Sequence, residues 1–174
     1  MKQFLYRLWL KLKNMKDKKT PLPPPKDTAG ESLDDPKWIV IAKQELGVSE
    51  WLKGKNPRIS EYHAASGHPQ YDQNTSWCSS FMCWVIEKAG FLSTNSAQAQ
   101  SWLKSVGCEK LDKPKYGCIV IFDRPSTSAK WDGHVTFWIG EDANYVYCLG
   151  GNQKNSVCYS KYPKKDVLGY RWPK

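Results

Sequence analysis

The chain has 174 residues, with nine Trp, nine Tyr and five Phe, and a formal net charge of +9. This length fits one folded domain with an additional segment, and the aromatic residues supply a core of ordinary size. No apolar run approaches the roughly 20 residues needed to cross a bilayer, so we expect no membrane-spanning helix.

The positive charge is concentrated at the N-terminus. Residues 1–26 hold eight Lys or Arg and one Asp, a net charge of +7, which leaves +2 for all other residues. A nucleic-acid-binding domain carries its basic residues on the folded face that contacts the ligand, and no zinc-finger or similar signature is present. We therefore expect no nucleic-acid partner.

Residues 1–19 form a basic arm with an amphipathic pattern. At helical spacing one side is apolar, with Phe4, Leu8 and Leu12, and lysines occupy much of the remainder. Such a helix suits an anionic membrane surface; a solvated or disordered tail is the alternative. The arm lacks the uninterrupted apolar stretch and small-residue cleavage site of a signal peptide, so we expect synthesis in the cytoplasm without one.

The remaining chain divides into a linker and one domain. Residues 20–35 are proline-rich and predict a stiff spacer, and residues 36–174 form the expected domain. Helices are predicted from Trp38 towards Gly47, from the Thr75–Ser76 pair to Gly90 with one broad apolar face, and over 97–106. Residues 50–73 have the composition of a loop.

The period of the apolar pattern changes from 3.6 to 2 after these helices. Apolar runs of strand length occupy 116–122, 134–139, 145–149, 157–159 and 169–172. Helices followed by an antiparallel meander predict an α+β domain.

Cys78 lies in the first turn of the predicted central helix. The helix dipole and free amides there stabilise a thiolate over a thiol, which suits a nucleophile. The alternative is a small buried hydrophobe, as free cysteines commonly are. Cys83 lies mid-helix and gains less from the dipole, so Cys78 is the candidate nucleophile.

His134 and Asn152 are the candidate partners of Cys78. His134 opens a predicted strand, and a hairpin centred on Ala143 places Asn152 opposite it, where the Asn152 side chain could orient the imidazole. Glu141 is too far along the strand, Asp132 lies on the loop side, and Gln153 is expected to face away. His63 and His68 are weaker candidates for the base. Suggested second oxyanion donors beside the Cys78 amide are Gln73 or Tyr71.

The cysteine spacing matches no metal site, and the predicted chemistry needs no metal or cofactor. We expect most of the six cysteines to be reduced packing residues. A disulfide, for example between Cys148 and Cys158, remains open.

Three short motifs together resemble the CHAP (cysteine- and histidine-dependent amidohydrolase/peptidase) domains and their NlpC-type relatives. They are Ser76-Trp77-Cys78-Ser79-Ser80-Phe81, Gly133-His134-Val135, and Gly150-Gly151-Asn152-Gln153, with Gly169-Tyr170-Arg171-Trp172-Pro173 as a similar tail. Two departures from the pattern are Gly117-Cys118, where Gly-Asp is usual, and serine in place of alanine near Ser79-Ser80.

The resemblance implies a papain-like fold that hydrolyses an amide or peptide bond of peptidoglycan through a thioester. Cys78 would be the nucleophile, His134 the base and Asn152 the orienting residue. Alternatives are an acyltransferase or deamidase acting on another amide, and a catalytically silent wall-binding module. We expect a monomer that acts in the periplasm or wall after export or lysis, with an immunity protein as partner if it is a toxin.

Overall fold

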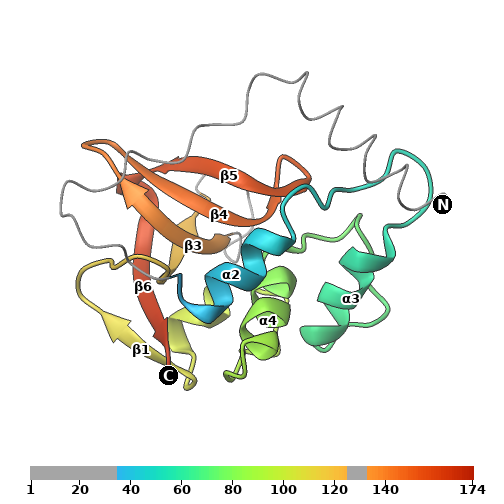
Figure 1. Ribbon diagram of the computed structural model, residues 1–174, viewed down its shortest axis with the longest axis horizontal. Coiled ribbons are helices and arrows are strands. Elements are labelled where there is room, and N and C mark those ends of the chain that lie inside the picture. The colour runs from blue at the N-terminus through green and yellow to red at the C-terminus, as the bar shows by residue number, and fades with distance from the viewer. Residues whose placement is uncertain (1–34, 125–132) are drawn as a thin grey trace.

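The computed structural model describes residues 35–124 and 133–174 (Figure 1). The predicted arm, residues 1–19, and the linker as far as residue 34 lie outside the described residues. No helix within the described residues has both the length and the apolar character to cross a membrane. The elements in chain order are α2 (Lys37–Gln44), α3 (Pro57–Ala65), α4 (Cys78–Lys88), η1 (Ala99–Lys104), β1 (Cys108–Leu111), β2 (Ile119–Asp123), β3 (Gly133–Glu141), β4 (Tyr145–Gln153), β5 (Ser156–Pro163), η2 (Lys164–Asp166) and β6 (Val167–Pro173).

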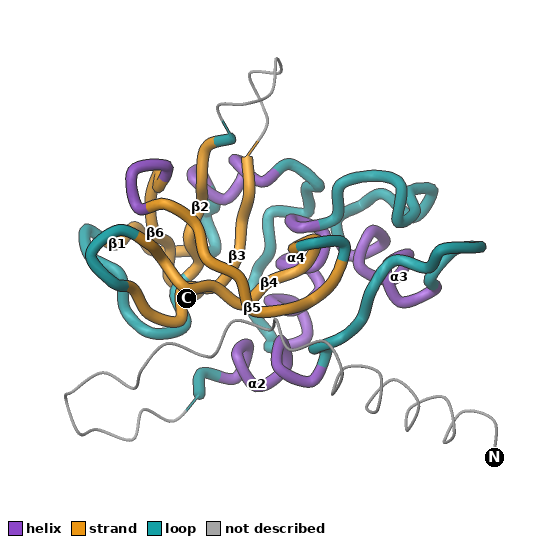
Figure 2. The backbone as a smooth tube through the Cα atoms, turned by 90° about the horizontal axis from the view of Figure 1, so that it is seen from above, coloured by secondary structure: helices purple, strands orange, loops and turns teal. Residues whose placement is uncertain are grey.

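A six-stranded antiparallel sheet forms one layer of the domain. The strand order is β1-β6-β2-β3-β4-β5, so β2 to β5 make a meander while β6 returns beside β2 and carries β1 at the edge. Figures 1 and 2 show α2, α3 and α4 gathered to one side of this curved sheet. The predicted α+β class is confirmed. The return of β6 and the pairing of β1 depend on contacts distant in sequence, which strand periodicity does not reveal.

Helix α4 is buried around its whole circumference, not on one face as its apolar pattern predicted. Every residue from Cys78 to Ile86 is buried, because α3 and α2 pack on the sides of α4 that the sheet leaves uncovered. Its two serines are satisfied inside the core: Ser79 Oγ donates to Ser96 O (2.7 Å) and Ser80 Oγ bonds His63 Nδ1 (2.9 Å). The helix ends at Lys88 with Ala89 as its C-cap, and the next residue, Gly90, has a φ of 92°, the left-handed conformation that glycine adopts without strain.

The two faces of the sheet carry separate apolar clusters. Side chains of β2 and β3 alternate between them, as the two-residue period of a strand requires. The helix-side cluster contains Ile121, Val135 and Phe137, together with α4. The opposite cluster contains Phe122 and Trp138 and is completed by side chains of the strands themselves, among them Tyr162.

Helix α3 lies inside the segment that its composition predicted to be a loop. Asn56 caps the helix by accepting a hydrogen bond from Arg58 N (3.0 Å), and Pro57 occupies the first turn. Both are ordinary helix-start signals. The many polar residues of this segment nevertheless favoured the prediction of a loop. Most of these residues face solvent, while Ile59 and Tyr62 are buried against α4.

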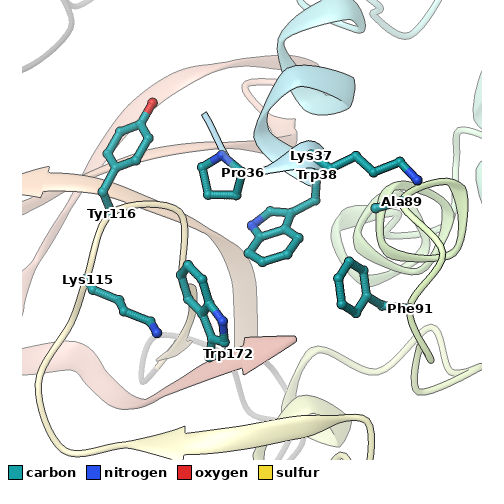
Figure 3. Close-up of a pocket in the computed structure, with 8 residues that line it drawn as sticks. All are labelled: Pro36, Lys37, Trp38, Ala89, Phe91, Lys115, Tyr116 and Trp172. Carbon is teal, nitrogen blue, oxygen red and sulfur yellow. The ribbon is translucent and has the colours of Figure 1, made fainter. Parts of the chain in front are cut away.

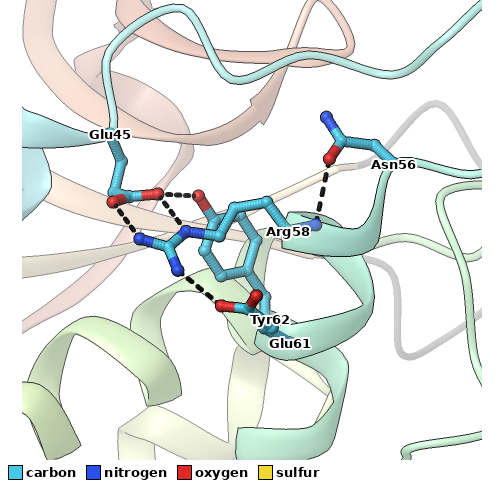
Figure 4. Close-up of polar contacts among 5 residues, drawn as sticks. All are labelled: Glu45, Asn56, Arg58, Glu61 and Tyr62. Atoms are coloured by element: carbon cyan, nitrogen blue, oxygen red, sulfur yellow. Dashed lines mark hydrogen bonds and ion pairs between the residues drawn. The ribbon is translucent and has the colours of Figure 1, made fainter. Parts of the chain in front are cut away.

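A partly buried polar cluster joins the C-terminal end of α2 to α3 (Figure 4). The Arg58 guanidinium donates two hydrogen bonds of 2.8 Å to Glu45, and the Tyr62 hydroxyl donates a third of 2.5 Å. Arg58 also pairs with Glu61 (2.5 Å) at the surface and lies 4.5 Å above the Trp84 ring. These contacts hold α2 and α3 on either side of α4.

Candidate active site

Cys78 lies in the first turn of α4, as the sequence predicted; it is the first residue of the helix and its side chain is only 2% exposed. The residue before it, Trp77, takes the N-cap position without a side-chain cap bond, so Thr75 and Ser76 do not cap the helix as expected. Trp77 is instead fixed by its indole N–H, which donates to Glu50 Oε1 (3.0 Å). The helix-start amides beside Cys78 are thereby presented to the thiol.

Burial raises the pKa of the Cys78 thiol above its ordinary value. Hydrogen bonds from the Val135 amide, the Ser76 side chain and the Ser79 amide, together with the charge of Arg124, act in the opposite direction but do not overcome it. The expected lowering by the helix dipole is therefore outweighed by loss of solvation, because a charged thiolate is costly in a buried site.

His134 lies near the start of β3, directly opposite Phe122 of β2. Its ring is fully buried and sits 4.9 Å from the ring of Tyr162. Nδ1 is 3.2 Å from Arg124 Nη2 and Nε2 is 3.3 Å from Gln153 Oε1. An arginine only donates, so Nδ1 accepts and the proton of the neutral ring is on Nε2, which donates to Gln153.

The pKa of His134 is lowered to about 3. Burial is the main cause and the positive charge of Arg124 adds to it, while the hydrogen bond with Gln153 acts in the opposite direction. The imidazole is therefore neutral near pH 7, the protonation state that a general base requires.

The structure does not bring the imidazole to the thiol. His134 contacts Phe122 and Tyr162 on the strand-lined face of the sheet, whereas Cys78 belongs to the helix-side cluster and meets the backbone of Val135. Within residues 35–124 and 133–174 no hydrogen bond joins the two side chains. Arg124 acts electrostatically on both groups, which places them in one neighbourhood on different sides of β3.

Asn152 does not orient His134; Gln153 contacts the imidazole instead. The predicted register between the strands is present where Phe137 faces Leu149 and Trp138 faces Cys148. Beyond it β4 is irregular between Gly150 and Gln153, with Asn152 at a φ of 55°. This irregularity shifts the alternation of side chains between the two faces of β4 by one residue, so Gln153 takes the position beside His134 that was predicted for Asn152.

Asn152 is instead turned towards the segment before Cys78. Its Nδ2 donates to Ser76 Oγ at 3.2 Å. The displaced residue, Gln153, also donates from Nε2 to Gly150 O (3.2 Å) and to Cys158 O. Gln153 is the residue beside the His134 imidazole that the sequence missed. The Gly150-Gly151 pair before it was the available signal, because adjacent glycines within a strand indicate an irregularity.

The weaker candidates are engaged in structural contacts. Gln73 accepts from Trp51 N (3.1 Å) and Asn56 N (3.0 Å) and donates to Trp51 O (2.8 Å), so its amide holds the backbone of these two residues together. His63 is fully buried between Ser80 Oγ and Asp72 O (3.1 Å). His68 stacks on Tyr71, with ring centroids 4.7 Å apart.

All six cysteines are free thiols. Cys148 lies opposite Ser160 and Cys158 opposite Gly150, so the disulfide left open by the sequence is not formed. The described residues contain no group of three or more His, Cys, Asp or Glu side chains that could hold a metal ion.

Comparison with known proteins assigns the central part of the chain to a domain class. Residues 70–152 match the CHAP domain model, and this span contains Cys78, His134 and Asn152. The match supports a CHAP-type domain within the α+β fold built around α4.

A solved structure of a lipoprotein-like NLP/P60 family protein from Staphylococcus aureus is similar at 19% identity, with a TM-score of 0.48. The similarity covers 84% of this chain and 44% of that one, so the chain spans less than half of the length of its structural neighbour. No curated protein matches the sequence significantly.

Proposed function

We propose that the protein is a peptidoglycan hydrolase that cleaves an amide or peptide bond of the cell-wall stem peptide through a Cys78 thioester. The observation that supports this most is the CHAP match over residues 70–152, in which Cys78 is the first residue of the central helix. A CHAP-type domain also favours action at the cell wall, outside the cytoplasm.

The proposed reaction proceeds in two steps. His134 takes the thiol proton, and the Cys78 sulfur attacks the carbonyl carbon, giving a tetrahedral oxyanion beside the helix-start amides. Collapse breaks the C–N bond, and the amine leaves with the proton from the imidazole. Water, activated by the same imidazole, then hydrolyses the thioester and regenerates the thiol. No metal or cofactor takes part, and a chelator should leave activity intact.

For this chemistry the His134 imidazole must reach the Cys78 thiol, which requires the backbone at the start of β3 to change, because rotation of a side chain does not carry it to the other face of a strand. Its present contacts with Gln153 and Arg124 hold the ring away from the thiol. A ring that moves in this way leaves Gln153, so Asn152, which is bound to Ser76 beside the nucleophile, remains the proposed orienting residue.

The separation of Cys78 from His134 favours a second candidate, a catalytically silent module that binds the wall. In that case the buried thiol with its raised pKa is a packing residue of the core. The two candidates make opposite predictions for the same digestion experiment.

The test is digestion of purified peptidoglycan by the wild type and by Cys78→Ala, with released fragments identified by mass spectrometry. We expect fragments from the wild type and none from the variant. Stem peptides released with a free alanine amino group, after cleavage of the amide between the lactyl group and alanine, would identify an amidase. Stem peptides cut between two amino acids would identify an endopeptidase. If neither protein releases fragments while both bind the wall, the silent module is correct; equal release by both would exclude Cys78 as nucleophile.

A further inference from the structure

A cavity with aromatic walls lies at the end of α4 opposite Cys78 (Figure 3). Its volume is about 720 Å³, within the range of small-ligand sites. It lies between the start of α2, the residues that follow α4, the segment before β2, and β6. The side chains that give it its chemical character are Trp38, Phe91, Tyr116, Trp172, Lys37 and Lys115.

The aromatic walls are held rigidly. Trp38 meets the rings of Phe91 and Trp172 edge-on, with centroids 5.2 and 4.9 Å apart. The Trp38 indole N–H is already used, since it donates to Gly117 O at 2.7 Å. The indole N–H of half-buried Trp172 has no hydrogen-bond acceptor among residues 35–124 and 133–174.

Two lysines flank these rings and supply positive charge. Lys115 Nζ lies 3.5 Å from the centroid of the Trp172 ring, and Figure 3 shows Lys37 on the other side of the aromatic group. Both residues are exposed. Neither ammonium has a carboxylate partner within residues 35–124 and 133–174, unlike Lys43, which pairs with Asp35 at 2.7 Å.

The cavity is separate from the candidate active site. Cys78 begins α4, whereas Ala89, which lines the cavity, follows its last residue. An α-helix of 11 residues is about 16 Å long. A ligand in the cavity would therefore not cover the thiol.

We propose that this cavity binds an anionic saccharide, a sugar ring that carries a carboxylate. The C–H face of a sugar packs on aromatic rings, and the carboxylate forms charge-assisted hydrogen bonds with the lysines. The inference rests on the proposed function for its source of ligand: cutting the lactyl amide of peptidoglycan leaves a carboxylate on the muramic acid. The cavity would keep the enzyme on a glycan strand that it has already processed.

The test uses the full-length protein and two defined sugars, N-acetylmuramic acid and the uncharged N-acetylglucosamine. Binding is followed by titration of the indole N–H resonances of Trp38 and Trp172 in NMR spectra. We expect N-acetylmuramic acid to shift these resonances and to bind at least about five times more tightly than N-acetylglucosamine. Lys115→Glu should weaken its binding roughly tenfold, the effect of losing one charge-assisted contact.

Lys113→Glu is the matched control, because Lys113 is exposed in the same segment but does not line the cavity. It should bind like the wild type. Lys115→Gln removes the charge with little change of shape, so it tests the same contact if Lys115→Glu does not fold. The inference is wrong if N-acetylmuramic acid leaves both indoles unshifted, if both sugars bind equally, or if the Lys113 and Lys115 variants behave alike.

Saccharide binding and hydrolysis are measured independently. Cys78→Ala should bind N-acetylmuramic acid as the wild type does. Binding without hydrolysis by the wild type would retain the cavity's assignment and overturn the proposed enzyme. Hydrolysis of peptidoglycan without binding of N-acetylmuramic acid would retain the proposed enzyme and overturn the cavity's assignment.

Discussion

At the scale of single residues, the ionisation of the candidate site is governed by burial. The start of α4 offers Cys78 the field that stabilises a thiolate, yet removal of water raises its pKa. The same loss of water acts on His134, where the charge of Arg124 reinforces it. Both groups are therefore held neutral, as thiol and imidazole, and proton transfer between them must begin from that state.

The lowered pKa of His134 makes stability depend on pH. The unfolded chain takes up a proton near pH 6.5, whereas the folded imidazole does so only near pH 3. The contribution of His134 to the unfolding free energy is therefore fully present above pH 6.5, and it is lost progressively as the pH falls towards 3. Between pH 7 and pH 5 we expect the wild type to lose about 2 kcal/mol more unfolding free energy than His134→Gln.

Urea unfolding of both proteins at the two pH values measures this difference. His63, whose pKa is also lowered by burial, contributes equally to both proteins and cancels in the comparison. Identical losses in the wild type and the variant would show that His134 titrates normally in the folded protein.

At the scale of elements, the close approach of β4 to α4 decides which side chains reach the site. A Cβ on Gly151 would lie 2.7 Å from atoms of Phe81 and Trp77, and one on Gly150 would lie 2.3 Å from Thr136 Oγ1. Only glycine fits at such separations, so Gly151 permits the close approach of β4 to α4, and Gly150 permits its close approach to β3. The irregular backbone that follows turns Gln153 to His134 and Asn152 to Ser76.

The join between α2 and α3 gives a prediction at the same scale. Glu45→Ala should lower the unfolding free energy by about 2–3 kcal/mol, because it leaves the buried Tyr62 hydroxyl and two Arg58 donors without their acceptor. Glu61→Ala removes the exposed partner of the same arginine and should cost less than about 1 kcal/mol. Chemical denaturation of both variants tests the difference, and equal losses would show that the buried carboxylate has no special role.

At the scale of the whole molecule, the charge of the chain is divided between the arm and the domain. Asp35 is bound to the domain through Lys43 and Tyr116, the latter at 2.7 Å. The N-terminal segment that can be removed without breaking these bonds therefore ends at residue 34. We propose that this segment draws the enzyme to anionic membrane and wall surfaces.

Deleting residues 1–34 should leave hydrolysis of purified peptidoglycan unchanged. Lysis of intact cells should fall at least about tenfold, since each basic residue near an anionic surface contributes about 1 kcal/mol. Turbidity loss of cells and fragment release from isolated walls are measured on the same preparations. Equal lysis by both proteins would contradict a delivery role, and a parallel loss on isolated walls would indicate that the segment supports catalysis itself.

The sequence by itself determined the local features of this protein. The apolar periods located α2, α4 and the strands from β2 to β6, Cys78 lies in the first turn of its helix as predicted, and the hairpin arithmetic gave the observed pairing of Phe137 with Leu149. These features depend on residues close together in the chain, where periodicity and turn chemistry act directly. The three motifs that resemble CHAP domains are likewise short stretches, and the domain match includes the first two.

Tertiary structure alone decided how the site residues meet. The two-residue period could not reveal that β4 leaves its regular register at Gly151, because the cause is the approach of Phe81 and Trp77 on a helix about 70 residues earlier. It could not place the His134 ring beside Tyr162, or show that Gln73 is occupied by the Trp51 backbone. Each outcome depends on which surfaces exclude water when distant segments pack, and that is set by the whole fold.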